Sequence, residues 1–329
     1  MGVMQETTTS GRAELEAALD GHRAELLGYC YRMLGSPFEA EDAVQETLLR
    51  AWRNLDRFEG RSAVKTWLHR IATNVCLDML RARERRQRPM DLGPAREPIA
   101  ENLRMLPEVT WIEPIPDKLI ASDPGPDESA VSRESVRLAF VAALQHLPPR
   151  QRAALILCEV MHWKAAEVAE LLDTTAASIN SALQRARATL KTTGANAADP
   201  MPKLDDARRA LLARYVDAFE RYDLDALTSV IREDASQSMP PYDLWLKGRE
   251  DMFRWWVGPG SACRDSRLVA TFSANGAPAF GQYKPSPAGG REPWSLQVIE
   301  IAPDGIAEIT FFLSTKTLFP LFGLPSRLD

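Results

Sequence analysis

Acidic and basic side chains divide sharply within one stretch of the chain, residues 41–88. Acidic and amide side chains recur at helical spacing in its front half, and five arginines fall within its last eight residues. Counted from the sequence, residues 11–60 sum to −4 and residues 61–88 to +6. Cations beside aromatic and amide groups suit single-stranded nucleic acid, because they neutralise phosphate while flat side chains accept bases. We expect the front half to contact a partner protein and the back half a polyanion.

Amphipathic helices must position these groups. Apolar periodicity predicts one or two helices over residues 13–34, a helix from Pro37, and a long helix over residues 63–86. The Gly35-Ser36-Pro37 turn separates the first two. The inward face of the helix from Pro37 is expected to carry Val44, Leu48, Leu49, Trp52 and Leu55.

Length and composition indicate a soluble multidomain protein. The chain has 329 residues, 45% hydrophobic, and a net charge of only −5. Four cysteines stand singly, so we expect reduced thiols, no metal site and no cofactor. The N-terminus has no apolar signal segment and no eighteen-residue apolar run occurs, so the expected location is cytoplasmic, without a membrane partner.

Composition changes mark the expected domains. A disordered lead-in covers residues 1–12, a helical domain 13–88, an acidic proline-rich linker in extended form 89–130, a second helical domain 131–193, a hinge 194–203 and a third domain 204–329. In the second domain, short helices flank the turn at Asp173-Thr174-Thr175, which is typical of a helix-turn-helix.

The third domain reads as helices followed by strands. Helices are expected over 205–219, 224–231 and 248–256, and strands over 267–272, 279–283, 294–301 and 306–313. This order predicts an α+β cone with a curved antiparallel sheet.

Two parts of the chain resemble bacterial group IV, or extracytoplasmic-function, sigma factors. The run AEDAVQETLLRAWRNLDRFEGRSAVKTWLHRIATNVCLDMLRAR resembles sigma region two almost without gaps. The run LPPRQRAALIL followed by AAEVAELLDTTAASINSALQRARATL resembles sigma region four. The resemblance implies two all-α domains, a region-two helical bundle and a region-four helix-turn-helix, that bind RNA polymerase core and double- and single-stranded promoter DNA.

The same resemblance assigns site residues. Those implied to bind polymerase are Asp42, Gln45, Glu46, Leu49, Arg50 and Arg53. Those implied to contact the minus-ten element are Arg57, Phe58, Arg61, Ser62, Lys65, Thr66, Trp67, Arg70, Asn74, Arg81 and Arg83. Those implied to contact the minus-thirty-five element are Lys164, Thr174, Thr175, Ser178, Asn180, Ser181, Arg185 and Arg187. Asn180 and Ala182 replace a lysine and an arginine of the family pattern, so we expect weaker phosphate binding and an altered base preference.

The third domain resembles the SnoaL-like, ketosteroid-isomerase-like fold, which encloses an apolar pocket. Candidate pocket residues are Met239, Tyr242, Trp245, Phe253, Trp256, Phe272, Phe280, Trp294 and Phe312. No matching catalytic carboxylate and histidine accompany them, so we expect no enzyme activity. For the linker two alternatives stay open: it threads the polymerase channels, or it contacts the third domain through Trp111, Ile112, Pro114 and Pro116.

The sequence therefore predicts a sigma factor whose fused third domain regulates it in cis. Its expected partners are polymerase core, promoter DNA, the SnoaL-like domain of the same chain and, as an open point, a small ligand. Two alternatives are a ligand-responsive helix-turn-helix regulator that works without polymerase core, and a SnoaL-like enzyme with a DNA-binding tether.

Overall fold

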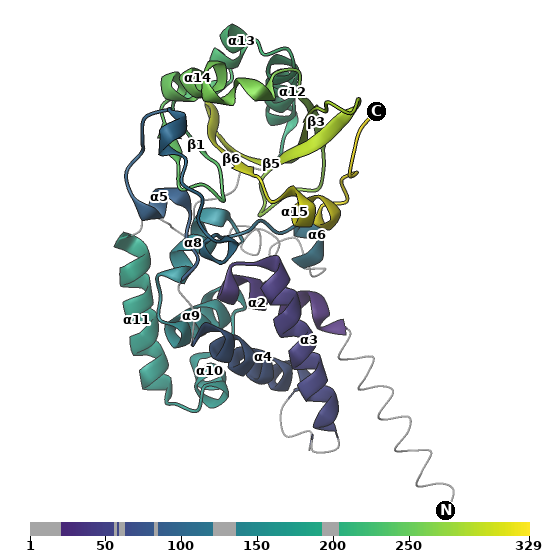
Figure 1. Cartoon of the computed structure of the whole chain (residues 1–329). Helices are drawn as coiled ribbons and strands as arrows, with labels where there is room; N and C mark the ends of the chain where they lie inside the picture. The colour runs from purple at the N-terminus through teal and green to yellow at the C-terminus, as the bar shows by residue number, and fades with distance from the viewer. Residues whose placement is uncertain (1–20, 56–57, 59–62, 82–84, 121–135, 193–203) are drawn as a thin grey trace, which may run out of the picture. The chain divides into compact units, whose positions relative to one another are not determined.

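The computed structural model describes residues 21–55, 58, 63–81, 85–120, 136–192 and 204–329 (Figure 1). They form two compact units. Unit 1 comprises Met1–Arg86, Ile112–Ile115 and Leu119–Asp199, and unit 2 comprises Gln87–Trp111, Pro116–Lys118 and Pro200–Asp329. The linker therefore supplies residues to both units. The predicted lead-in 1–12 and hinge 194–203 lie outside the described residues.

The first part of unit 1 is a bundle of three helices: α2 (Arg23–Leu34), α3 (Pro37–Arg53) and α4 (Val64–Leu80). Gly35 ends α2 in the left-handed region, with φ 76°, and donates its backbone N–H to Tyr31 O. Ser36 then begins α3, its side chain accepting from Glu39 N, with a proline at the first helical position. The cap residues thus reverse the chain within two residues.

The outward side of α3 differs from the prediction. Leu49 is 48% exposed and Trp52 52% exposed, so placing them on the inward face was wrong. Small and β-branched residues form the buried stripe instead: Ala40, Ala43, Val44, Thr47 and Ala51. Small side chains allow close helix packing, which turns the two large apolar side chains outward.

The helix predicted to reach residue 86 stops at Leu80. Arg86 is buried, and its guanidinium lies 2.6 Å from Glu39 Oε1 and 3.6 Å from Glu113 Oε2. These two carboxylates hold Arg86 away from a helical continuation and away from solvent. Of the described arginines at the end of the basic segment, Arg85 is exposed and Arg86 is buried, so they do not share one exposed face.

The second part of unit 1 contains the predicted helix-turn-helix. Its elements are α8 (Leu138–Gln145), α9 (Pro149–Leu155), the π-turn η4 (Ile156–Val160), α10 (Ala165–Leu171) and α11 (Ala176–Thr192). Asp173, with φ 50°, lies in the turn between α10 and α11. The buried face of α11 is Ile179, Leu183, Ala186 and Leu190, at helical spacing.

Within its described residues 89–120, the linker forms only elements of three or four residues, which fits its proline content. They are α5 (Pro89–Leu92), η2 (Ala100–Asn102), η3 (Glu108–Thr110) and α6 (Asp117–Ile120).

Unit 2 is built on a curved six-stranded sheet with order β2-β1-β6-β5-β4-β3. The strands are β1 (Ile231–Ser238), β2 (Trp245–Lys247), β3 (Arg267–Ala270), β4 (Ala279–Pro285), β5 (Arg291–Ala302) and β6 (Gly305–Phe312). The helices are α12 (Asp206–Glu220), α13 (Leu224–Thr228), α14 (Arg249–Val257), η5 (Pro259–Cys263) and α15 (Thr315–Leu321). Figure 1 shows α12, α13 and α14 gathered on one side of this sheet.

The predicted α+β cone is confirmed, but its sheet is mixed and not purely antiparallel. β1 pairs with β6 in parallel, with Gln237 opposite Ile309. β1 was missed because its residues IREDASQS are mostly polar, and the helix predicted to reach Ile231 ends at Thr228. Parallel pairing with β6 brings the polar side chain of Gln237 into the interior, where it is 1% exposed.

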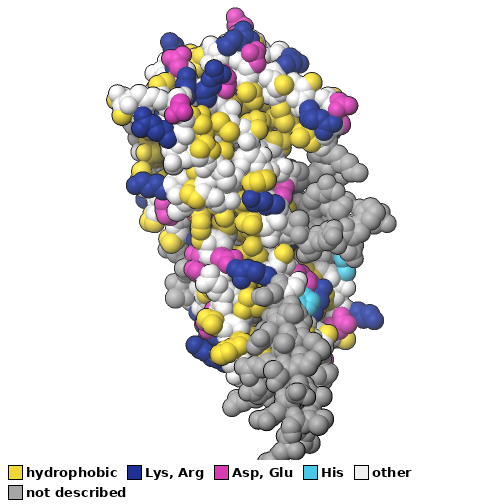
Figure 2. All heavy atoms as spheres, turned by 90° about the vertical axis from the view of Figure 1, so that its right-hand side faces the viewer, with side chains coloured by type: hydrophobic (Ala, Val, Ile, Leu, Met, Phe, Trp, Pro, Cys, Tyr) yellow, Lys and Arg dark blue, Asp and Glu magenta, His cyan; other side chains and the backbone are white. Residues whose placement is uncertain are grey.

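On the face drawn in Figure 2, lysine and arginine side chains are interspersed with acidic and apolar ones. A mixed surface does not create the single-sign field that attracts nucleic acid over a distance. Within the described ranges, no helix combines the length and the apolar character that a bilayer crossing requires.

Candidate promoter and polymerase interfaces

One side of α3 presents a stripe of polar and apolar side chains, which we call the α3 stripe: Asp42, Gln45, Glu46, Leu49, Arg50, Trp52 and Arg53. Asp42, Gln45, Leu49, Trp52 and Arg53 are exposed, and Glu46 and Arg50 are half-buried. Arg50 donates from Nε to Glu46 Oε1 at 2.6 Å, which orders the centre of the stripe. Two exposed large apolar groups beside carboxylates are typical of a protein-docking surface. Trp52 was predicted to be buried, and its place in the docking surface was missed, because its spacing along the helix fits the buried stripe as well as the exposed one.

The polar face of α4 holds the predicted minus-ten residues that the structure describes. Lys65, Thr66, Trp67 and Arg70 are half-buried, and Asn74 and Arg81 are exposed. Phe58 stacks on Trp67 with ring centroids 4.9 Å apart, which brings the loop aromatic beside the cations. Four predicted residues, Arg57, Arg61, Ser62 and Arg83, lie outside the described residues.

Within unit 1, this face of α4 packs on the helix-turn-helix. Arg70 donates from Nη2 to the carbonyl oxygen of Glu170 at 2.6 Å and lies 4.0 Å from Asp173 Oδ1. The ring of His69 lies 5.2 Å from that of Trp163, just before α10. A residue predicted to contact the minus-ten element is therefore already paired with a backbone oxygen of the helix-turn-helix.

A buried arginine extends the same junction. Arg152 is 2% exposed and donates to Met33 O of α2, as well as to Gln145 O at 3.1 Å and Leu147 O at 3.2 Å. Gln145 Nε2 in turn donates to Arg32 O at 3.3 Å. Desolvation lowers the pKa of Arg152 to about 10, so the guanidinium stays charged near neutral pH. Its several acceptors compensate for burial of that charge.

His69 is the buried titratable group at this junction. It is 0% exposed, its Nδ1 lies 2.9 Å from Lys65 O, and its Nε2 has no partner among the described residues. Burial lowers its pKa to about 4, against a raising influence of the Lys65 carbonyl and Glu25. The buried position therefore favours the neutral imidazole.

The predicted minus-thirty-five residues are spread over the helix-turn-helix: Lys164 precedes α10, Thr174 and Thr175 lie in the turn, and the others lie on α11. Lys164, Thr174, Thr175, Ser178, Asn180, Ser181, Arg185 and Arg187 are all exposed. They do not form a single face. Ser178, Ser181 and Arg185 share one side of α11, since a helix turns about 100° per residue. Arg187 projects from the other side and donates from Nε to Glu159 Oε1 at 2.6 Å.

The four linker residues predicted to contact the third domain divide between the units. Trp111, 3% exposed, belongs to unit 2, and Pro116 forms a bridge with Ala274 there. Ile112 and Pro114 belong to unit 1. There the adjoining Glu113 donates its N–H to Gly35 O at 3.0 Å.

Other linker segments are bound to unit 2 by specific contacts. Asp117 donates its N–H to Ser273 O and accepts from Gly276 N, both in the turn between β3 and β4. Arg96 forms a two-pronged ion pair with the buried carboxylate of Asp243, at 3.0 and 3.3 Å. Residues 87–111 and 116–118 of the linker are thus part of unit 2.

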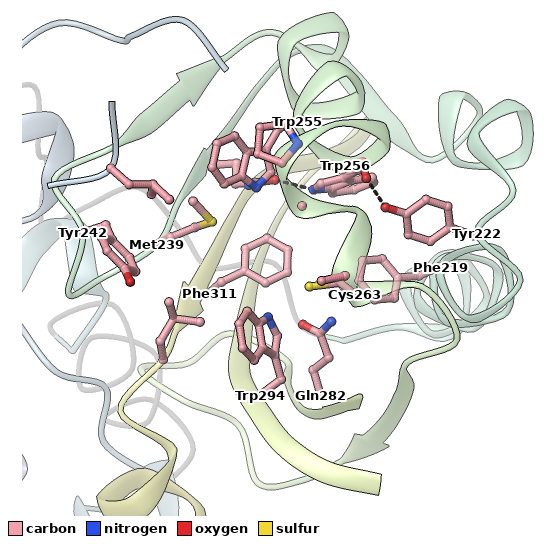
Figure 3. A pocket seen from close by; sticks show the side chains of 16 residues that line it. Phe219, Tyr222, Met239, Tyr242, Trp255, Trp256, Cys263, Gln282, Trp294 and Phe311 are labelled. Atoms are coloured by element: carbon pink, nitrogen blue, oxygen red, sulfur yellow. Dashed lines mark hydrogen bonds between the residues drawn. The ribbon is translucent and has the colours of Figure 1, made fainter. Parts of the chain in front are cut away.

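A cavity of about 210 Å³ opens in unit 2 between the sheet and α14 (Figure 3). Of the predicted pocket residues, four line it: Met239, Tyr242, Trp256 and Trp294. The others lie elsewhere: Trp245, Phe253, Phe272, Phe280 and Phe312. Phe272, for example, is 44% exposed and lies under the ammonium of Lys118.

The chemistry of the cavity favours binding over catalysis. No carboxylate, histidine, lysine or arginine lies among its sixteen lining residues. Burial raises the pKa of the one thiol that lines it, Cys263, so this side chain stays protonated near neutral pH. Among the described residues, no cluster of three or more histidine, cysteine and acidic side chains is arranged to hold a metal ion.

These features define a class of protein with a three-helix bundle, a helix-turn-helix and a fused α+β cone. Family models match the chain as sigma-70 region 2 over residues 19–86 and as sigma-70 region 4 over residues 137–190. The chain is 45% identical to the ECF RNA polymerase sigma factor SigG of Mycobacterium tuberculosis, over 98% of this chain and 87% of that one. The chain belongs to the extracytoplasmic-function RNA polymerase sigma factor family.

Two further comparisons agree with this assignment. The ECF RNA polymerase sigma factor SigJ of Mycobacterium tuberculosis is 31% identical over 65% of this chain and 61% of its own length. The crystal structure of a Mycobacterium tuberculosis SigJ matches with a TM-score of 0.59 at 20% identity, covering 95% of this chain and 99% of that one. This structural likeness supports the fold over nearly the whole chain.

Proposed function

We propose that this sigma factor directs RNA polymerase core to promoters in the cytoplasm and that its third domain restrains promoter binding in cis through the linker. The observation that carries the proposal is the pairing of Arg70 with Glu170 O inside unit 1. A guanidinium that is bonded to region four cannot at the same time neutralise a phosphate of the minus-ten element. The arrangement described above is therefore a closed, promoter-incompetent state.

The linker is proposed to hold this state. Promoter binding requires regions two and four to separate, and the linker between them must change its path when they do. Its residues 87–111 and 116–118 are bound by the third domain, and residues 112–115 pack within unit 1. Each of these contacts stabilises the docked linker and so opposes opening. Binding of polymerase core supplies the opposing free energy.

The α3 stripe is the proposed docking face for polymerase. Replacing Gln45 and Glu46 together by alanine is expected to weaken binding to core at least tenfold, because both lie at the centre of the stripe. Glu250→Ala, on exposed α14, serves as the control. A pull-down titration with purified core gives the affinities, and equal affinity of the double variant and the wild type would refute the docking face. It would also revive the reading of a regulator that works without core.

Removing the third domain tests the regulation. A chain ending at residue 203 is expected to give more promoter-specific transcription with purified core than the full chain, because the linker loses most of its partners. Arg96→Ala is a milder test. It leaves the buried Asp243 without its cation, and since Arg96 is 39% exposed we expect a severalfold rise in transcription only.

Arg254→Ala provides the matched control for the milder test. Arg254 also pairs with an aspartate of unit 2, Asp251 at 3.0 Å, but among the described residues neither forms a hydrogen bond or ion pair with the linker. Unchanged transcription in both the shortened chain and Arg96→Ala would refute regulation in cis. The sigma assignment would stand in that case.

A further inference from the structure

The cavity of unit 2 has the size and lining of a binding site for a small aromatic molecule. Figure 3 shows Trp256, Trp294, Phe311 and Phe219 around one central space. At about 210 Å³ it exceeds the roughly 150 Å³ cavity in another protein that binds benzene. A molecule of one or two fused rings fits this volume. Because no charged residue lines the cavity, a charged ligand would lose its hydration without compensation.

One polar group of the lining has a free donor. Gln237 is 1% exposed, and its Oε1 accepts from Trp256 Nε1 at 2.7 Å, which fixes the orientation of the amide. Its Nε2 then has no acceptor among the described residues. The second amide of the cavity, that of Gln282, is different because Ser266, Ser295 and Gln297 satisfy both of its ends. A ligand with a hydrogen-bond acceptor would pair with Gln237.

The linker forms part of the same cavity. Leu103 is one of its lining residues, and the backbone carbonyl oxygen of the adjoining Arg104 accepts from Asp243 N at 3.0 Å. Leu106 N donates to Pro241 O at 3.0 Å, so the linker runs along the segment that carries Tyr242, another lining residue. An occupant would therefore contact the linker directly through Leu103.

We propose that this cavity binds an uncharged one- or two-ring molecule that carries a carbonyl-type acceptor, and that binding strengthens the docking of linker residues 93–106. The coupling to transcription rests on the proposed regulation in cis, whereas the binding site does not. The bound molecule adds contacts to Leu103 only when the linker is docked, so it favours the docked linker.

The probe is 1-tetralone, a neutral two-ring ketone, titrated into the full-length protein and followed by isothermal calorimetry. Tetralin, which lacks the acceptor, is expected to bind about fivefold more weakly, the effect of one hydrogen bond. The anion 1-naphthoate is expected not to bind. No saturable binding of 1-tetralone up to its solubility limit would overturn the proposal, as would tighter binding of 1-naphthoate.

Alkylation by iodoacetamide locates the site. Cys263 lines the cavity, so bound 1-tetralone is expected to slow its alkylation about tenfold at saturation. Cys158, a half-buried thiol of unit 1, is the internal control in the same sample and should react at an unchanged rate. Binding without protection of Cys263 would place the probe elsewhere and overturn the assignment. Gln237→Leu should abolish the preference for 1-tetralone over tetralin. If that variant does not fold, the comparison of 1-tetralone with tetralin on the wild type still tests the role of the ligand's carbonyl group.

Hydrogen exchange of the linker tests the coupling. Bound 1-tetralone is expected to slow amide exchange in residues 93–106 of the wild type, and to do so less in Leu103→Ala. Ile99→Ala is the matched control, because Ile99 lies in the same segment, 39% exposed and outside the cavity lining. Protection of Cys263 without any change in linker exchange would refute the coupling and leave the site. Unchanged transcription in the truncation and Arg96→Ala experiments would refute the regulation in cis, but it would leave the binding site and its coupling to the linker standing.

Discussion

Lowering the pH should destabilise the folded protein through His69 in unit 1. The imidazole is 0% exposed, its pKa is lowered to about 4, and its Nε2 has no partner among the described residues. An unfolded chain protonates histidine near pH 6.5. The folded-state pKa lies below the unfolded one, so the neutral ring stabilises the fold fully above pH 6.5. That stability is lost as the pH falls from about 6.5 towards 4.

The magnitude follows from these two pKa values. Between pH 7 and pH 5 the linkage amounts to about 2 kcal/mol, at roughly 1.4 kcal/mol for each unit of pH once the unfolded histidine is protonated. Urea denaturation followed by circular dichroism at both pH values measures it. His69→Asn keeps a donor for the Lys65 carbonyl but cannot be protonated. Between pH 7 and pH 5, its free energy of unfolding should therefore fall by about 2 kcal/mol less than that of the wild type.

The control for this experiment is His162→Asn. His162 is exposed and has a backbone φ of 57°, a conformation that asparagine tolerates well. Its pH dependence should match that of the wild type. If His69→Asn shows the same loss between pH 7 and pH 5 as the wild type, the buried neutral imidazole is not what couples stability to pH, and the reasoning fails.

Three further outcomes are expected. Arg86→Ala removes the buried cation between two carboxylates and should lower the free energy of unfolding by about 3 kcal/mol in urea denaturation, because a buried charge loses its partner. Gly290→Ala would bring a Cβ to 2.6 Å from Leu328 O, whereas the Cβ of Gly289→Ala meets nothing within 4 Å. Because both glycines have positive φ, the two variants differ mainly in this contact. Thermal melts should show Gly290→Ala to be less stable than Gly289→Ala by about 1–3 kcal/mol. Asn180→Lys restores a cation on an exposed face of α11 and should increase promoter affinity and steepen its salt dependence by about one ion, measured by fluorescence anisotropy at several salt concentrations.

Most helices could be predicted because local signals mark their ends. Ser36, Pro37 and Gly35 set the boundary between α2 and α3, and the apolar spacing of α11 matches its buried face. Trp52 was misplaced because periodicity identifies a stripe but not which of two adjacent stripes is buried. Here the small residues beside it decide, since only they allow close packing.

Longer-range features left no local signal. β1 is polar in sequence and becomes a central strand only by pairing with β6, about seventy residues later. The pairing of Arg70 with Glu170 O joins residues one hundred positions apart, and a backbone carbonyl carries no side-chain signature. The sequence did predict the cavity's aromatic character, but the contribution of Leu103 depends on how the linker is docked.

In the proposed regulation, the double use of Arg70 makes closure behave as a competitive inhibitor built into the chain. In that scheme a promoter binds only the open fraction of molecules, so its apparent dissociation constant rises in proportion to the inverse of that fraction. Each 1.4 kcal/mol in favour of the closed form raises it about tenfold. Any event that breaks the contact between Arg70 and the Glu170 carbonyl therefore increases promoter affinity without altering a single residue that reads DNA.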